Sequence, residues 1–169
     1  MDGVPEVTGS LNGAYNAGQT GIFSGRFHAA ILSGAITLFD VNGRELIRGQ
    51  EISLMAAPES SFTLSGVTIG KSFHWERKEN QTFKGDLILK RRGSDRIVII
   101  NNVHLEDYLE SVISSEMSSD SPAEFLAAHA ILSRSWLLAA LKRKQLCSEN
   151  SSVIPPHDFE NLASHISPL

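Results

Sequence analysis

The sequence predicts an α+β fold in which an N-terminal antiparallel β region packs against a two-helix hairpin. The prediction rests on a change of pattern near residue 103: short alternating runs broken by Gly and Asn precede it, and helical periodicity follows it. With 169 residues the chain can hold one ordinary domain with an appendage. We expect a β-rich segment over 1–60, a core of a β hairpin and two helices over 61–145, and an irregular tail over 146–169.

Turns that contain Gly and Asn divide the first 100 residues into short strands. Asn12-Gly13 and Asn42-Gly43 are the strongest hairpin signals, because a type I′ turn needs positive φ at both central residues, and Gly93-Ser94 is a weaker one. The run Ile97–Ile100 is β-branched throughout, so we expect its strand to be central in the sheet and covered on both faces. The expected strands are Phe27–Leu32, Ala35–Asp40, Ser61–Leu64, Phe73–Arg77, Phe83–Lys90 and Arg96–Asn101.

Two helices are expected after residue 103. Apolar residues recur at three- and four-residue steps from Leu105 and predict a helix of about three turns that ends near Glu116. After a polar break, Ser121-Pro122-Ala123-Glu124 is a helix start signal, with an N-cap, a first-turn proline and the glutamate of a capping box. The second helix is expected to run to about Lys144. Its predicted apolar stripe comprises Phe125, Ala128, His129, Leu132, Trp136, Ala139 and Ala140, widened by Leu126, Ala130, Leu137 and Leu141.

Composition limits the possible partners. A net charge of −4 gives no basic face for nucleic acid, so no nucleic-acid partner is expected. The six histidines show no ligand spacing, and the single cysteine, Cys147, allows no internal disulfide; we expect no metal site and no cofactor. Neither a signal-like N-terminus nor a stretch near the ~20 apolar residues of a membrane span is found, so a soluble chain without a membrane span is expected.

Glu116 stands where the apolar first helix ends and a polar turn begins. A carboxyl group against apolar surroundings can act as the general acid that cleaves a glycosidic bond. A hydrolase adds a second carboxylate, but Glu106, Asp107, Glu110 and Asp120 form no obvious pair with Glu116. The sequence therefore favours chemistry with one carboxyl group, in which the substrate's own 6-hydroxyl attacks and a 1,6-anhydro sugar forms. The alternative is a solvated glutamate, which the dipole at a helix C-terminus disfavours slightly.

Arg134 is a second unusual residue, because it lies in an otherwise apolar or small stretch of the second helix. It either extends its charge to solvent or is held by a carboxylate. In a helical hairpin it could reach the polar turn near Glu116, or it could orient a substrate. His129, on the apolar stripe, is interpreted as a core or interface histidine.

Taken together, these residues resemble the SpoIID/LytB domain family, which contains the sporulation stage II protein D and the amidase enhancers. The resemblance covers residues of about 62–145, roughly half of the chain. The motifs that carry it are Tyr108-Leu109, Val112-Ile113, Ser115-Glu116-Met117, Pro122-Ala123-Glu124, Ala128-His129-Ala130 and Arg134-Ser135-Trp136.

The resemblance implies an activity and a site. Sporulation members are lytic transglycosylases that cleave peptidoglycan glycan strands, so the resemblance implies this substrate and a place in the cell envelope. It implies that Glu116 is the acid/base and that Arg134 contributes to catalysis. Ser115, Met117 and Tyr108 are then expected to contact the glycan.

Two features depart from the family pattern. Ala127 stands where members usually carry lysine. The second half of the family domain, with its Asp-x-Cys-Gln-x-Tyr-x-Gly-like stretch, has no visible counterpart after Gln145, so we expect it to be absent. Two alternatives to an active enzyme follow: a non-catalytic module that binds the cell wall or enhances a cell-wall amidase, and a truncated inactive copy.

Overall fold

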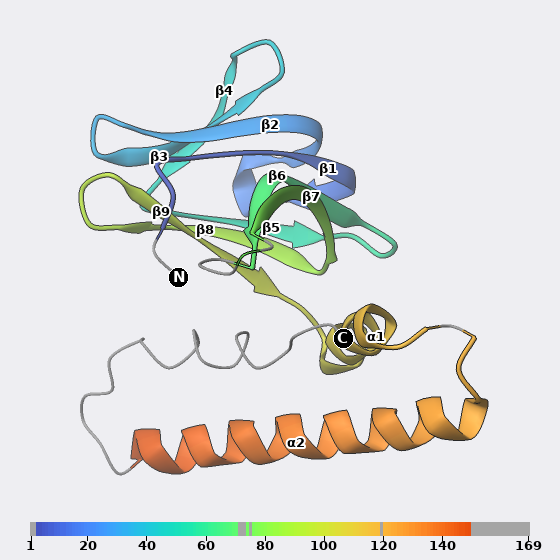
Figure 1. Ribbon diagram of the computed structural model, residues 1–169. Helices are drawn as coiled ribbons and strands as arrows, with labels where there is room; N and C mark the ends of the chain where they lie inside the picture. The colour runs from blue at the N-terminus through green and yellow to red at the C-terminus, as the bar shows by residue number, and fades with distance from the viewer. Residues whose placement is uncertain (1–2, 71–73, 75, 119, 150–169) are drawn as a thin grey trace. The chain divides into compact units, whose positions relative to one another are not determined.

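The computed structural model describes residues 3–70, 74, 76–118 and 120–149. The contacts between residues divide the chain into two compact units, Met1–Val103 and His104–Leu169. The first unit contains the strands and the second contains the helices (Figure 1). The expected α+β class is therefore confirmed. One sheet joins strands from both sides of the boundary expected near residue 60.

The described strands of the first unit form a nine-stranded antiparallel sheet. Its main path is β4-β3-β2-β1-β5-β8-β9, while β6 pairs with β1 and β7 pairs with β6. A single 3-10 turn, η1 (Gly18–Thr20), links the first two strands. In chain order the strands are β1 (Glu6–Asn16), β2 (Ile22–Leu32), β3 (Ala35–Asp40), β4 (Glu45–Gly49), β5 (Glu51–Ala56), β6 (Ser61–Ile69), β7 (Arg77–Lys84), β8 (Asp86–Arg92) and β9 (Arg96–Asn102).

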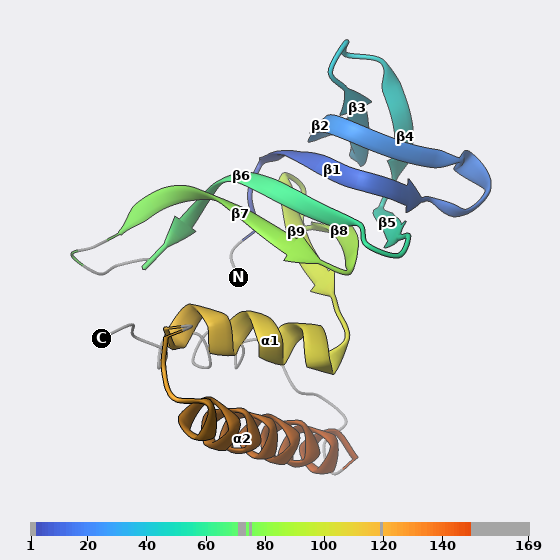
Figure 2. The same cartoon turned by 90° about the vertical axis from the view of Figure 1, so that its right-hand side faces the viewer.

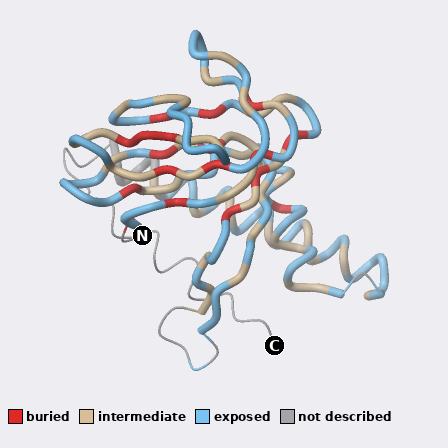
Figure 3. Tube along the Cα trace, turned by 90° about the horizontal axis from the view of Figure 1, so that it is seen from above, coloured by how far each residue is buried: buried red, intermediate tan, exposed pale blue. Residues whose placement is uncertain are grey.

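The sheet folds over onto itself and encloses one apolar core. Strand β3 contacts β8, and β2 contacts β9, although neither pair is hydrogen-bonded. Buried positions alternate with exposed ones along β5 and the start of β6, as expected for strands with one face on a core (Figure 3). The core residues are Val7, Leu11, Tyr15, Phe27, Ala29, Ile36, Leu38, Ile52, Leu54, Phe62, Leu64, Leu87, Leu89 and Ile97.

Asn12-Gly13 does not form the expected hairpin turn. Strand β1 continues through it, and the pairing register with β2 shifts between Leu11 and Tyr15, where Gly13 has a φ of 108°. This irregularity redirects the strand, so that its first part pairs with β6 and its last residues pair with β5. Leu11 and Tyr15 stay buried on either side of it, which favours a bulge over a turn.

Two other turn signals are confirmed. Asn42-Gly43 lies between β3 and β4, where Gly43 has a φ of 77° and the Asp40 carboxylate accepts hydrogen bonds from the Asn42 and Arg44 backbone N–H groups. Gly93, with a φ of 67°, turns the chain between β8 and β9.

Two strand predictions were wrong in detail. The expected strand Phe83–Lys90 is divided at Gly85, whose φ of 90° separates β7 from β8. The β-branched run lies in β9, at the end of the sheet's path rather than in its centre, and Ile100 is 39% exposed. The β-branched residues indicated a strand correctly but carried no information about how many neighbours it has. Of the expected strand Phe73–Arg77, Phe73 and Trp75 lie outside the described residues, His74 lies in a turn, and only Arg77 belongs to a strand, as the first residue of β7.

The second unit is a helical hairpin of α1 (Leu105–Glu116) and α2 (Ala123–Glu149), shown in Figure 2. Glu106 and Asp107 lie in the first turn of α1, where the helix dipole favours negative charge. The Pro122 carbonyl accepts the Leu126 N–H, so helical bonding of α2 begins at the predicted start signal. Helix α2 continues past Lys144 to Glu149, into the segment expected to be an irregular tail.

The partly covered side of α2 is only a part of the predicted apolar stripe, mainly the row that widened it. The half-buried residues are Leu126, His129, Ala130, Ser133, Leu137, Ala140 and Lys144, which, apart from the neighbours His129 and Ala130, follow at three- and four-residue steps. By contrast, Phe125, Leu132 and Trp136 are 50%, 69% and 49% exposed. Helix α2 is apolar on several sides, so periodicity alone could not indicate which side contacts α1.

Part of α2, Ala123–Lys144, is long and apolar enough to cross a membrane. Its most apolar stretch has a mean hydropathy of 1.2, and no residue of that stretch is buried. The expectation that no stretch has this length and composition was therefore wrong. Core helices of soluble proteins can have the same length and apolar composition, so these two properties are weak evidence for a membrane span.

Candidate active site

Glu116 is the last residue of α1, and the backbone turns away directly after it. The Met117 N–H still donates to the Ile113 carbonyl at 2.9 Å, but the backbone of Met117 is extended, with φ −120° and ψ 141°. The polar residues that follow cannot extend the apolar face of the helix. The Glu116 side chain is consequently positioned at the open end of α1, beside the start of α2.

Glu116 contacts His129 of α2. The distance between Glu116 Oε2 and His129 Nε2 is 3.1 Å, and the two side chains are only 23% and 16% exposed. On the other side of the imidazole ring, Nδ1 lies 3.5 Å from Oγ of Ser133, one helical turn further along α2. The turn between the helices thus brings a carboxylate, an imidazole and a hydroxyl group into one row.

Arg134 lies elsewhere on the hairpin. It forms an ion pair with Glu106 of α1, and both side chains are more than half exposed, at 51% and 65%. The sequence suggested that Arg134 could reach the turn near Glu116; in the structure its carboxylate partner is Glu106 instead. Exposed ion pairs of this kind contribute little to stability, about 0–1 kcal/mol, so Arg134 is available for another partner.

The three expected substrate contacts have different environments. Tyr108 is 41% exposed on α1. The Ser115 hydroxyl donates to the Val112 carbonyl at 2.8 Å, a bond within its own helix, and Met117 is half-buried at the helix end. Ser115 and Met117 flank Glu116 directly in sequence, whereas Tyr108 lies eight residues before it. Among the described contacts, none joins these three side chains to the carboxyl group of Glu116.

Glu116 is the carboxyl group at the turn of the hairpin. Over the described part of the chain, no second carboxylate contacts Glu116 or His129. Nor do the described residues contain a group of three or more His, Cys, Asp or Glu side chains that could hold a metal ion. A carboxyl group in this position can donate or accept one proton.

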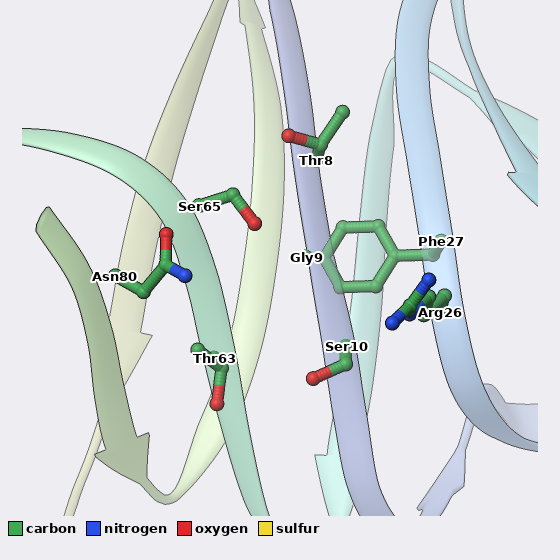
Figure 4. A pocket seen from close by; sticks show the side chains of 8 residues that line it. All are labelled: Thr8, Gly9, Ser10, Arg26, Phe27, Thr63, Ser65 and Asn80. Carbon is green, nitrogen blue, oxygen red and sulfur yellow. The ribbon is translucent and has the colours of Figure 1, made fainter.

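A polar hollow of about 380 Å³ lies in the first unit (Figure 4). Its walls come from β1, β2, β6 and β7, and the register of these strands places Arg26, Ser10, Thr63 and Thr82 side by side across the sheet. Within the described residues Arg26 forms no ion pair or hydrogen bond, and it is exposed. The lining residues are Thr8, Gly9, Ser10, Arg26, Phe27, Thr63, Ser65 and Asn80.

The hydroxyl groups beside this hollow are already linked to one another. Asn12 Nδ2 donates to Oγ1 of Thr63 at 3.0 Å, and Thr63 Oγ1 lies 2.8 Å from Oγ1 of Thr82. Ser10 Oγ donates to Asn12 Oδ1 at 3.1 Å. Each hydroxyl oxygen retains capacity for a further hydrogen bond, so the surface presents ordered polar groups beside an uncompensated positive charge.

Sequence reasoning singled out Glu116 and Arg134 but missed the role of three neighbours. His129 was interpreted as a core or interface histidine without a named partner, Glu106 was not paired with Arg134, and Ser133 was not considered. The partners of His129 and Glu106 lie 13 and 28 residues away in sequence, across the turn between the helices. The only sequence signal available was the i, i+4 spacing of His129 and Ser133, which is common on helices.

Comparison with known proteins identifies the segment that contains this site. The family model of SpoIID, stage II sporulation protein, matches residues 93–161. The chain is thus similar to the SpoIID family over this segment. The expected family resemblance is thereby confirmed, although the match begins at residue 93 rather than near 62. It also includes residues 146–161, which we expected to lie outside the family domain.

The remaining comparisons cover less of the chain. An uncharacterized protein of Brachyspira hyodysenteriae is 36% identical over 45 residues, which amount to 27% of this chain and 12% of that protein. No solved structure matches the chain. SpoIID proteins are associated with the cell wall, so this match broadly supports a function related to the cell wall.

Proposed function

We propose that this chain carries the acid/base residue of a lytic transglycosylase site that cleaves peptidoglycan glycan strands in the cell envelope. The observation that carries the proposal is the position of Glu116: it is a partly shielded carboxyl group, held at a helix end, in a segment that is similar to the SpoIID family.

The proposed reaction uses Glu116 twice. The carboxylic acid first donates its proton to the glycosidic oxygen, and the bond between that oxygen and the anomeric carbon breaks. The resulting carboxylate then accepts the proton of the substrate's 6-hydroxyl, whose oxygen bonds to the same anomeric carbon. The product is a 1,6-anhydro sugar, and Glu116 is protonated again at the end of the cycle.

Arg134 is proposed to orient the glycan. Its guanidinium group is exposed, and its bond to Glu106 is weak enough to be exchanged for a substrate oxygen. Ser115, Met117 and Tyr108 remain proposed substrate contacts on the same hairpin.

The proposal is tested with purified, peptide-stripped peptidoglycan strands. We expect the full chain to produce 1,6-anhydro-muramyl ends, detected by mass spectrometry, and Glu116→Gln to produce none while retaining its helical content. Glu110→Gln is the matched control, because it removes an exposed acid from the same helix and should leave product formation unchanged. Equal product from the wild type and Glu116→Gln would contradict the proposal.

A second candidate function is a non-catalytic module that binds cell-wall glycan or enhances an amidase. The polar hollow of the first unit favours it, because ordered hydroxyl groups lie beside Arg26, which has no partner among the described residues, and this surface suits a polyhydroxylated ligand that bears a carboxylate. In this case Arg26→Gln should weaken binding to glycan strands, and Glu116→Gln should change neither binding nor amidase stimulation. Unchanged binding by Arg26→Gln would contradict this role of the hollow.

A further inference from the structure

We propose that His129 is a positioning residue that holds the carboxyl group of Glu116 in one orientation for proton transfer; this inference rests on the acid/base role proposed for Glu116. The imidazole lies on α2 and the carboxyl group on α1, so their contact spans the hairpin. Catalytic groups must be held within a fraction of an ångström of the productive geometry, and a displacement of about 1 Å can cost on the order of 100-fold in rate.

The contact engages only one of the two carboxyl oxygens. Oε2 of Glu116 lies 3.1 Å from His129 Nε2. Within the described part of the chain, Oε1 accepts no hydrogen bond. One oxygen is therefore fixed by the protein, while the other is left for the glycosidic oxygen or the 6-hydroxyl of a substrate.

The Ser133 hydroxyl can select which ring nitrogen of His129 carries the proton. When the Ser133 hydroxyl donates to Nδ1, a neutral imidazole must carry its hydrogen on Nε2, the nitrogen that faces Glu116. The 3.5 Å separation makes this a weak hydrogen bond. The helix keeps the two side chains next to each other, because His129 and Ser133 are one turn apart on α2. The imidazole then donates to the carboxylate that remains after the first proton transfer.

The same contact explains why an acid is tolerated at this helix end. A negative charge at a helix C-terminus is disfavoured by the dipole, and Glu116 is also partly desolvated. A hydrogen-bond donor aimed at Oε2 compensates for both effects. Among the described residues, the donor that contacts Glu116 is His129.

The first test is kinetic and uses variants of the full chain. His129→Ala removes the donor, and we expect kcat to fall at least about tenfold with KM changed less than twofold, because orientation is lost but the glycan contacts remain. His129→Gln retains an N–H donor of similar reach and should restore kcat to within about threefold of the wild type. Ser133→Ala should give a smaller loss than His129→Ala.

A matched control exists in the first unit. Glu6 and His28 form a comparable pair, with 3.2 Å between Oε2 and Nε2, but far from α1 and α2 in the sequence. His28→Ala should leave kcat unchanged. If His129→Ala has the kcat of the wild type, or if His129→Gln is as impaired as His129→Ala at equal thermal stability, the positioning role is wrong.

The second test does not depend on activity. Three-bond NMR couplings of a labelled Glu116 side chain should indicate one predominant rotamer in the wild type and in His129→Gln, and rotamer averaging in His129→Ala. If the wild type forms no anhydro product, the proposed function fails, and these couplings still decide the inference. Averaging in the wild type, or an unchanged single rotamer in His129→Ala, would overturn it.

Discussion

Oε2 of Glu116 lies 3.1 Å from Nε2 of His129, which joins the last residue of α1 to the second turn of α2. The two residues are 13 positions apart, on either side of the polar break, and both side chains are mostly shielded from solvent. Glu116 is therefore not the freely solvated helix-end acid that its sequence position alone would allow. Its orientation depends on how the two helices meet.

Arg134 and Glu106 should have separable effects. Because their ion pair is exposed, Glu106→Gln should change the free energy of unfolding by less than about 1 kcal/mol. If Arg134 orients the glycan, Arg134→Gln should lower anhydro product formation, whereas Glu106→Gln should not. Chemical denaturation and the product assay measure the two effects, and equal activity losses in both variants would show that only the ion pair matters.

Thr37 offers a stabilising substitution in the core of the first unit. Its side chain is fully buried in β3, and no described group forms a hydrogen bond with Oγ1. Thr37→Val replaces this hydroxyl with a methyl group of similar shape, so unfolding should become about 1 kcal/mol more unfavourable. Urea denaturation measures the change. The matched control is Thr63→Val, which should not stabilise because it removes exposed hydrogen bonds.

Gly9 should not accept a side chain. A Cβ atom there would lie 2.3 Å from the Thr63 carbonyl oxygen and 2.9 Å from the Phe27 ring, both held by the sheet and the core. Gly9→Ala should therefore destabilise the chain by roughly 1–3 kcal/mol, the usual cost of overpacking. Gly66→Ala is the control, because its Cβ would meet nothing within 4 Å and only its φ of 65° opposes the change. Equal stability of Gly9→Ala and the wild type would contradict this packing.

Tyr15 should make the first unit sensitive to alkaline pH. Burial, together with the negative charge of Asp86, raises the pKa of Tyr15 to about 12, and its hydroxyl donates to the Gly85 carbonyl at 3.2 Å. Above pH ~10 the unfolded chain loses this proton while the folded chain keeps it, so the free energy of unfolding falls as pH rises to about 12. The expected loss is on the order of 2 kcal/mol.

The comparison between wild type and Tyr15→Phe isolates this effect from the other groups that titrate at high pH. Tyr15→Phe should be less stable at neutral pH because it lacks the hydrogen bond to Gly85. Its stability should nevertheless decline less between pH 10 and 12. Parallel pH profiles of the two proteins would show that Tyr15 is not the responsible group.

The sequence predicted those features that depend on local chemistry. Asn42-Gly43 formed a turn because its neighbours could pair as a hairpin, and Ser121-Pro122 marked the start of α2. Asn12-Gly13 has the same local chemistry, but Leu11 and Tyr15 both contribute to the core, and the strand continues through a bulge. Local residues could not distinguish these two outcomes, since the difference lies in which strands pair on each side.

The candidate site was predictable in part for the same reason. Glu116 was singled out as a candidate from its helix end and its motif. The partner of His129 could not be predicted, because it is determined by the crossing of α1 and α2. The sequence also could not separate the side of α2 that faces α1 from the rest of the predicted stripe, since Phe125 and Leu132 are as apolar as Leu126 and Leu137.

The central claim is that Glu116 performs transglycosylation with the substrate's own hydroxyl group as nucleophile. The most direct measurement is digestion of peptide-stripped glycan strands in ¹⁸O-labelled water, with the new ends analysed by mass spectrometry beside Glu116→Gln. The account predicts ends that are lighter than a reducing end by one water molecule, free of ¹⁸O, and missing in Glu116→Gln. Ends that carry ¹⁸O would show hydrolysis instead, and unlabelled anhydro ends at wild-type levels in Glu116→Gln would show that Glu116 is not the acid.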